Sequence, residues 1–160
     1  MPTGAVLPFA GSSAPSGYLL CFGQAVSRST YATLFGVIST AYGTGDGSST
    51  FNLPDLRGRI AAGMDGMGGS AASRLTSTTM SPDGNTLGAT GGTQTHTLIT
   101  AEMPAHTHSV PGQIQVGNDL GSAAGYAAGL VNTGTSTSTG GDGAHLNVQP
   151  TLALNYMIKT

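Results

Sequence analysis

The spacing of apolar residues predicts short strands and one short helix in the first 62 residues. Apolar runs at residues 4–10 and 18–22 are typical of strands. Pro8 places the first run at a sheet edge, because proline has no N–H to donate to a neighbouring strand. A short helix is predicted around residues 31–38, where four apolar side chains recur at helical spacing. These four are Tyr31, Leu34, Phe35 and Ile38.

This regular pattern ends near residue 62. The glycine-rich residues 63–70 predict a flexible connector, and Pro82-Asp83-Gly84-Asn85 is a strong turn signal. Apolar residues are sparse between 71 and 92. We therefore expect short strands and loops here that pack on something else, such as a neighbouring subunit.

Strand-like patterns return in the last third of the chain. A threonine-rich run at 93–99 predicts a strand, and one helical turn follows at 100–103, stopped by Pro104. The apolar run 151–159 predicts the last strand. Residues 112–144 between them are of low complexity, mostly Gly, Ala, Ser and Thr. A long loop between two ordered strands is often a binding loop.

Composition indicates that a single copy of the chain has too small a buried core to be stable alone. Charged residues make up only 8% of the sequence, against about 25% in typical globular proteins. Twenty-six glycines raise the entropy that folding must overcome. Chains of this kind usually gain extra burial from an oligomer, a metal or a repetitive β architecture.

Charge and hydropathy exclude several classes of partner. The net charge of −2 and the lack of a basic patch argue against nucleic acid and anionic membranes. No run approaches the roughly 20 apolar residues of a membrane span. No signal peptide is visible, so we expect synthesis in the cytoplasm without export by that route. The single cysteine, Cys21, lies in an apolar run and is predicted to be a buried free thiol.

Candidate catalytic groups are few. Asp55, Arg57 and Arg59 stand together in a chain with little charge, and we interpret them as an ion pair that pins an irregular segment. No serine has a nucleophile-elbow context and no carboxylate pair stands out. The residues therefore favour a protein that is not an enzyme.

Two histidines separated by one residue are the clearest candidate for metal binding. His106 and His108 lie on one face if the strand is extended, but two imidazoles are only half of a metal site. Within one chain, His96 or His145 would have to complete it. On a threefold axis, three pairs would supply six nitrogens, which suits Fe(II), Co(II) or Ni(II) and leaves zinc possible. We expect His96, Glu102 and His145 to be structural or to support the metal ligands.

The motifs of the first 62 residues resemble a known family. The opening Gly-Ala-Val-Leu-Pro-Phe-Ala-Gly, residues 15–23, residues 29–35 and the Phe-Asn-Leu-Pro-Asp-Leu-Arg-Gly-Arg motif at 51–59 resemble the phage tail collar domain. That family occurs in tail-fibre proteins of tailed bacteriophages and in bacterial proteins called microcystin-dependent proteins. The resemblance covers residues 1–62.

The second half resembles the metal-binding, receptor-recognising head that follows the collar in phage tail fibres. The matching patterns are Gly-Gly-Thr-Gln-Thr-His-Thr-Leu, Glu-Met-Pro-Ala-His-Thr-His-Ser and the His-x-Asn-x-Gln-Pro run from His145. In that family three chains intertwine, and His-x-His pairs bind zinc or iron on the threefold axis. The resemblance implies one Fe(II) or Zn(II) ion per trimer, held by His106 and His108.

Together these observations predict an α+β collar unit with one short helix at 1–62. An all-β or irregular intertwined head follows at 63–160, with the loop-rich tract 112–144, and the whole is an obligate homotrimer. We expect a phage tail-fibre tip or adhesin in the virion tail, docked on a carrier protein and bound to a bacterial surface glycan or protein. The alternatives are a stand-alone microcystin-dependent-type protein and a metal-dependent hydrolase. Candidate receptor contacts in the tract 112–144 are Asn118, Asp119, Tyr126 and Asn132. The alternative for this tract is packing along the trimer axis.

Overall fold

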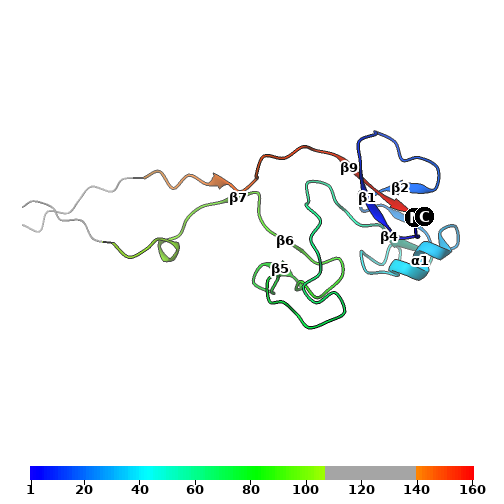
Figure 1. The fold of residues 1–160 in the computed structure, drawn as a ribbon, viewed down its shortest axis with the longest axis horizontal. Coiled ribbons are helices and arrows are strands. Elements are labelled where there is room, and N and C mark those ends of the chain that lie inside the picture. Colours follow the sequence, from blue (N-terminus) through cyan, green and yellow to red (C-terminus); the bar gives the residue numbers. More distant parts are fainter. Residues whose placement is uncertain (107–139) are drawn as a thin grey trace, which may run out of the picture. The chain divides into compact units, whose positions relative to one another are not determined.

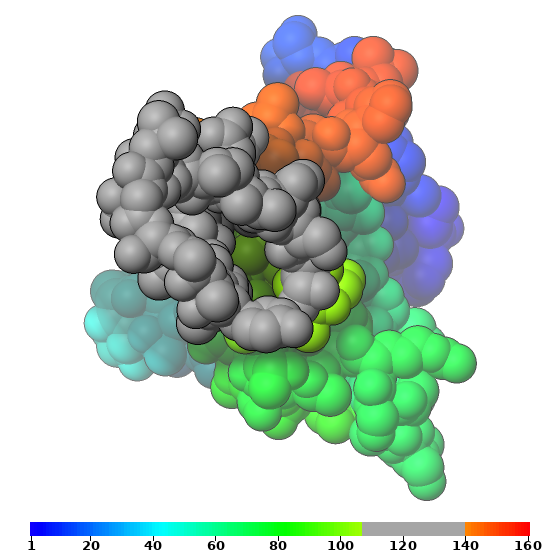
Figure 2. Space-filling view, turned by 90° about the vertical axis from the view of Figure 1, so that its left-hand side faces the viewer, coloured from blue at the N-terminus to red at the C-terminus, as the bar shows by residue number. Residues whose placement is uncertain are grey.

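The last strand of the chain lies in the middle of its first sheet. The computed structural model describes residues 1–106 and 140–160. Strand β9 (Asn155–Lys159) pairs antiparallel with β1 (Val6–Phe9) on one side and β2 (Tyr18–Leu20) on the other (Figure 1). In the space-filling view the red C-terminal residues lie at the surface beside the blue N-terminal ones (Figure 2). The sheet therefore joins both ends of the chain.

Strand β1 is an edge strand, as Pro8 predicts. The sheet order is β1-β9-β2, so β1 has a neighbour on one side only. Pro8 is placed opposite Tyr156 in the register with β9. The missing N–H of proline is tolerated at an edge but would break the ladder of a central strand.

The core lies where helix α1 (Ala32–Ile38) and the pair β3 (Ala25–Ser27) and β4 (Thr50–Asn52) meet the sheet. Leu34 and Ile38, four residues apart on α1, are both buried, which confirms the predicted face. The rings of Phe35 and Phe51 pack with centroids 5.1 Å apart. The buried cluster consists of Cys21, Leu34, Ile38, Phe51, Leu53 and Ile158.

Residues 63–94 are organised by a carboxylate and add no member to that buried apolar cluster. The Asp65 side chain accepts hydrogen bonds from the backbone N–H groups of Ser73, Arg74 and Leu75 at 2.7, 2.8 and 3.0 Å. These bonds favour the charged form and lower the pKa of Asp65. In the same stretch, strand β5 (Met80–Ser81) pairs antiparallel with strand β6 (Thr90–Gly91). The stretch 63–70, predicted to be a flexible connector, thus contains Asp65, whose carboxylate is the hydrogen-bonding hub of this segment. The predicted turn at 82–85 is confirmed.

Gly84 is required beside this hub. A Cβ atom at position 84 would lie 2.3 Å from both the carbonyl oxygen and the Cβ of Leu75. The Gly84 N–H donates to that same carbonyl at 2.9 Å, and the Gly84 carbonyl accepts from the Asp65 N–H at 2.8 Å. Any larger residue would separate the two segments.

The compact units divide the chain differently from the predicted domains. One unit comprises residues 1–94 with 148–160, and the other lies between residues 95 and 147. The boundary at 62/63 put the last strand in the head, whereas β9 is hydrogen-bonded within the first unit. As functional domains, 1–62 and 63–160 stay predictions.

The described residues have the predicted mixture of structure in coarse terms. They contain one short α-helix, small antiparallel sheets and much irregular chain. Within these residues no helix is long and apolar enough to cross a membrane. The intertwined trimer stays a prediction.

Candidate functional site

Two histidines face each other across a pair of short strands in the second unit. Strand β7 (Thr95–His96) pairs antiparallel with β8 (His145–Leu146), and His96 is directly opposite His145. Their rings meet edge to face, with centroids 5.7 Å apart. The predicted threonine-rich strand at 93–99 thus exists, but only two of its residues pair.

Glu102 joins this pair from a short 3-10 helix, η1 (Thr100–Glu102). Its Oε2 accepts the N–H of Ile99 at 2.9 Å, which satisfies a donor at the start of η1. The same oxygen lies 2.7 Å from Nε2 of His96. The Ile99 N–H and then His96 lower the pKa of Glu102. Because an ionised carboxylate can only accept, Nε2 of His96 carries the proton.

His96 and Glu102 are joined by a hydrogen bond, and the ring of His145 contacts that of His96. The structural role predicted for the three residues stays a prediction. One oxygen of Glu102 both accepts the Ile99 N–H at the start of η1 and contacts His96. Among the residues that the structure describes, no group of three or more His, Cys, Asp or Glu side chains is arranged to hold a metal. Support of a metal ligand by these three residues remains a prediction.

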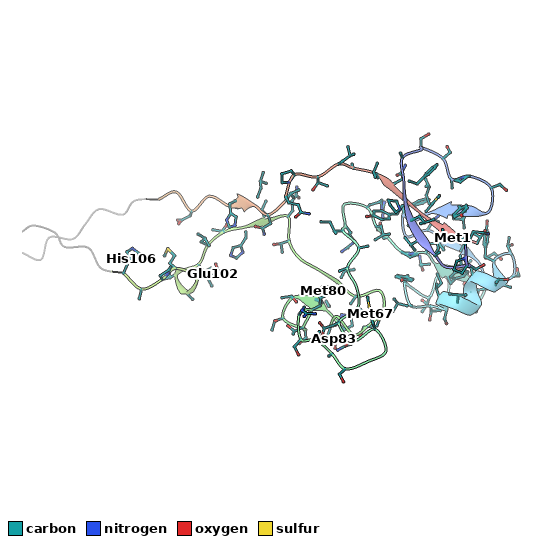
Figure 3. The ribbon with its side chains drawn as sticks, in the orientation of Figure 1. Met1, Met67, Met80, Asp83, Glu102 and His106 are labelled. Carbon is teal, nitrogen blue, oxygen red and sulfur yellow. The ribbon has the colours of Figure 1, made fainter. Side chains whose placement is uncertain are left out.

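His106 follows η1 on the same outgoing segment, four residues after Glu102 (Figure 3). Its Nδ1 lies 3.0 Å from the carbonyl oxygen of Pro104. A backbone carbonyl that accepts from Nδ1 places the lone pair on Nε2, and a metal-ligating histidine commonly donates its other ring N–H in this way. The ligand role of His106 stays a prediction. His108 lies outside the described residues, as do Asn118, Asp119, Tyr126 and Asn132.

The predicted Asp55–Arg57 ion pair is present in the first unit. Nε and Nη2 of Arg57 bind the two carboxylate oxygens at 2.8 and 2.7 Å. The guanidinium lowers the pKa of Asp55 to about 2. The backbone around it is tied to the strand that precedes it, with Leu56 N–H bonded to the Cys21 carbonyl at 3.1 Å. The pair pins an irregular segment, as interpreted from the sequence.

A cavity of about 330 Å³ lies beside this segment. It was missed from the sequence, because its walls come from stretches more than 90 residues apart. One signal pointed to it: apolar residues alternate from 146 to 158 and continue past the end of the sheet. The lining residues are Leu20, Cys21, Phe22, Leu56, Arg57, Gly58, Leu154, Asn155 and Tyr156.

Comparison with known proteins identifies the first part of the chain. Residues 4–61, a little over a third of the sequence, match the family model described as Phage Tail Collar Domain. No curated protein matches the chain. The collar is a structural domain of tail fibres and not an enzyme family. The match confirms that the N-terminal motifs resemble the phage tail collar domain.

Proposed function

We propose that this protein is a tail-fibre tip or adhesin that attaches a phage or phage-like particle to its host cell. The observation that carries the proposal is the collar domain at residues 4–61, which indicates a tail-fibre-type protein. The collar docks on the carrier protein of the tail, and the part of the chain that leaves the collar meets the bacterial surface. The working location is the virion tail.

The path of the chain supports separate docking and receptor-binding parts. The chain leaves the first unit after residue 94 and rejoins it at residue 148. Its outgoing and returning segments pair at β7 and β8. The chain thus belongs to the first unit up to residue 94 and again from residue 148, and we assign contact with a receptor to the stretch between. We assign Asn118, Asp119, Tyr126 and Asn132 to that contact.

Three chains and one metal ion complete the proposal. None of the described residues between 95 and 147 is buried, and an isolated two-stranded pair is at best marginally stable in water. Three intertwined chains would supply the missing cover. His106 and His108 of each chain would hold one Fe(II) or Zn(II) ion, which would link the chains as a structural staple. The hydrogen bond between Nδ1 of His106 and the Pro104 carbonyl, which places the lone pair on Nε2, supports this role.

Native mass spectrometry with metal analysis tests the staple. The wild type should be a trimer with one transition-metal ion, and His106→Ala/His108→Ala should lose the ion and most of the trimer. The matched control, Ser12→Ala/Ser13→Ala, changes two exposed residues of the first unit and should keep the ion. A wild-type monomer, or a trimer without metal, would overturn the staple. One ion per chain with an open position would favour the hydrolase instead.

Cell adsorption tests the receptor role separately. Replacing residues 118–134 by a Gly/Ser linker should preserve the trimer and abolish adsorption to host cells. A matched linker in the exposed loop at 76–79 should leave adsorption intact, because that loop belongs to the first unit. Unchanged adsorption of the 118–134 variant would place the receptor contact elsewhere.

A further inference from the structure

Four aspartates of this chain are each followed directly by a glycine. They are Asp46, Asp65, Asp83 and Asp142. Because glycine has no side chain to shield it, its backbone nitrogen can reach the carboxyl carbon of the preceding aspartate. The nitrogen bonds to that carbon, a water molecule leaves, and a succinimide ring forms. A second water molecule then opens the ring. Opening at the main-chain carbonyl yields isoaspartate, in which the main chain runs through the former side chain.

This rearrangement needs two free groups. The carboxyl group must turn towards the glycine nitrogen, and it reacts in its protonated form, because the ionised form has no good leaving group. Hydrogen bonds to the carboxylate hold it in place and favour its ionised form. The glycine N–H must lose its proton to solvent, and donation to a carbonyl prevents this. Hydrogen bonds to the two groups therefore decide which of the four pairs reacts in the folded chain.

At Asp46 both groups are occupied. Its carboxylate accepts the backbone N–H groups of residues 48–50 at 3.0, 2.8 and 2.9 Å, and the Ser49 hydroxyl as well. The Ser49 hydroxyl and then these N–H groups lower the pKa of Asp46. The N–H of Gly47 donates to the Thr44 carbonyl at 3.0 Å. The fold therefore protects this pair.

Asp65 and Asp83 are protected in related ways. The carboxylate of Asp65 is held by the N–H groups of residues 73–75, which lower its pKa. Asp83 lies in the same segment (Figure 3), and its Oδ1 accepts the N–H two residues further on at 2.9 Å. The N–H of Gly84 is occupied too, since it donates to the Leu75 carbonyl at 2.9 Å.

Asp142 differs from the other three. It is exposed, and so is Gly143. Within residues 1–106 and 140–160, no group donates a hydrogen bond to the Asp142 carboxylate, and the N–H of Gly143 has no acceptor. A Cβ atom at position 143 would meet no atom within 4 Å beyond its chain neighbours, so the space around that nitrogen is open. Both groups that succinimide formation needs are therefore free.

From these observations we propose that Asp142 is the site at which the folded chain forms isoaspartate, while the other three Asp-Gly pairs are protected by the fold. The new linkage adds one methylene to the main chain three residues before His145. In β8 His145 lies opposite His96, so the change lengthens the chain beside the β7–β8 pair. The inference goes beyond the proposed function and depends neither on the receptor contact nor on the metal.

Ageing of the full chain at neutral pH and physiological temperature tests the site, in buffer and in concentrated urea. Electron-transfer mass spectrometry, which distinguishes isoaspartate from aspartate by the main-chain fragments, measures each pair. In buffer, isoaspartate should accumulate at residue 142 about tenfold faster than at residues 46, 65 or 83, because local structure protects those three. In urea that protection is lost, and the four rates should agree within about threefold.

Two variants test whether the reaction uses the glycine nitrogen. Gly143→Val places a branched side chain beside that nitrogen and should slow the reaction at Asp142 about tenfold. The matched control, Gly141→Val, places the same side chain before the aspartate, also in open space, and should leave the rate unchanged. Equal rates at the four pairs in buffer, or no isoaspartate at residue 142, would overturn the inference. Equal rates in the two variants would overturn the succinimide route. None of these results bears on the receptor role, which cell adsorption tests.

Discussion

At the scale of single residues, three carboxylates hold loops of this weakly charged chain in place through hydrogen bonds. Asp46, Asp65 and Glu102 each accept backbone N–H groups of their own loops. Each of these carboxylates has a lowered pKa, because hydrogen bonds favour the charged form. For Asp46 the Ser49 hydroxyl contributes most, followed by the backbone N–H groups. Polar side chains thus fix segments for which few buried apolar side chains are available.

Cys21 should make stability fall at alkaline pH. Burial raises the pKa of its thiol from 9.0 to about 11. The folded state therefore holds the proton more tightly, and the resulting stability is full below pH 9 and is lost as the pH rises towards 11. Urea unfolding should show a smaller alkaline loss in Cys21→Ala than in the wild type. Equal slopes in the two proteins would contradict this account.

Asp55 should act at the opposite end of the pH range. Its pKa falls from 3.8 to about 2 beside Arg57. A lowered carboxyl pKa gives stability that is present above pH 4 and is lost as the pH falls towards 2. The stability difference between the wild type and Asp55→Asn should therefore shrink over that window. Arg57→Gln should remove the same window, whereas Arg74→Gln, the matched control, should leave it unchanged.

At the scale of elements, α1 offers the sharpest contrast between covered and uncovered side chains. Leu34 is 1% exposed and Val37, on the same helix, is 57% exposed. Leu34→Ala should lower the free energy of unfolding by about 3 kcal/mol through lost contacts and a cavity. Val37→Ala should lower it by about 0.5 kcal/mol or less. Thermal and urea unfolding would measure both, and equal losses would mean that the helix packs by another face.

How far the sequence predicts each element depends on the range of the contacts that form it. The face of α1 follows from residues three and four apart, so periodicity finds Leu34 and Ile38. The turn at 82–85 is equally local. The 2.7 Å contact of Glu102 with His96 spans six residues, and the sequence did not identify His96 as the partner of Glu102. The pairing of β9 with β1 leaves no local trace, because any apolar strand would satisfy the same alternation.

At the scale of the whole molecule, closure of the chain on itself is the main feature that sequence patterns did not reveal. The run 151–159 was predicted as a strand, but not as the central strand of the first sheet. Its neighbours are fixed by atoms far away in sequence, such as the Cys21 N–H that donates to the Tyr156 carbonyl at 2.9 Å. Asn155 likewise donates its side-chain amide to the Gly11 carbonyl at 2.8 Å. The collar therefore depends on a segment that the collar match at 4–61 does not include.

This dependence predicts how fragments behave. Residues 1–62 alone lack β9, so β1 and β2 have no common partner and Ile158 is missing from the core. That fragment should show no cooperative unfolding and little dispersion of its amide NMR signals. Residues 1–94 joined to 148–160 by a Gly/Ser linker keep every strand of the sheet and should unfold cooperatively. Changing Ile158 to Asp in the linked form is the matched control and should abolish cooperativity again. A cooperative transition in residues 1–62 alone would mean that the collar folds without the return of the chain, and β9 would then be only an accessory strand.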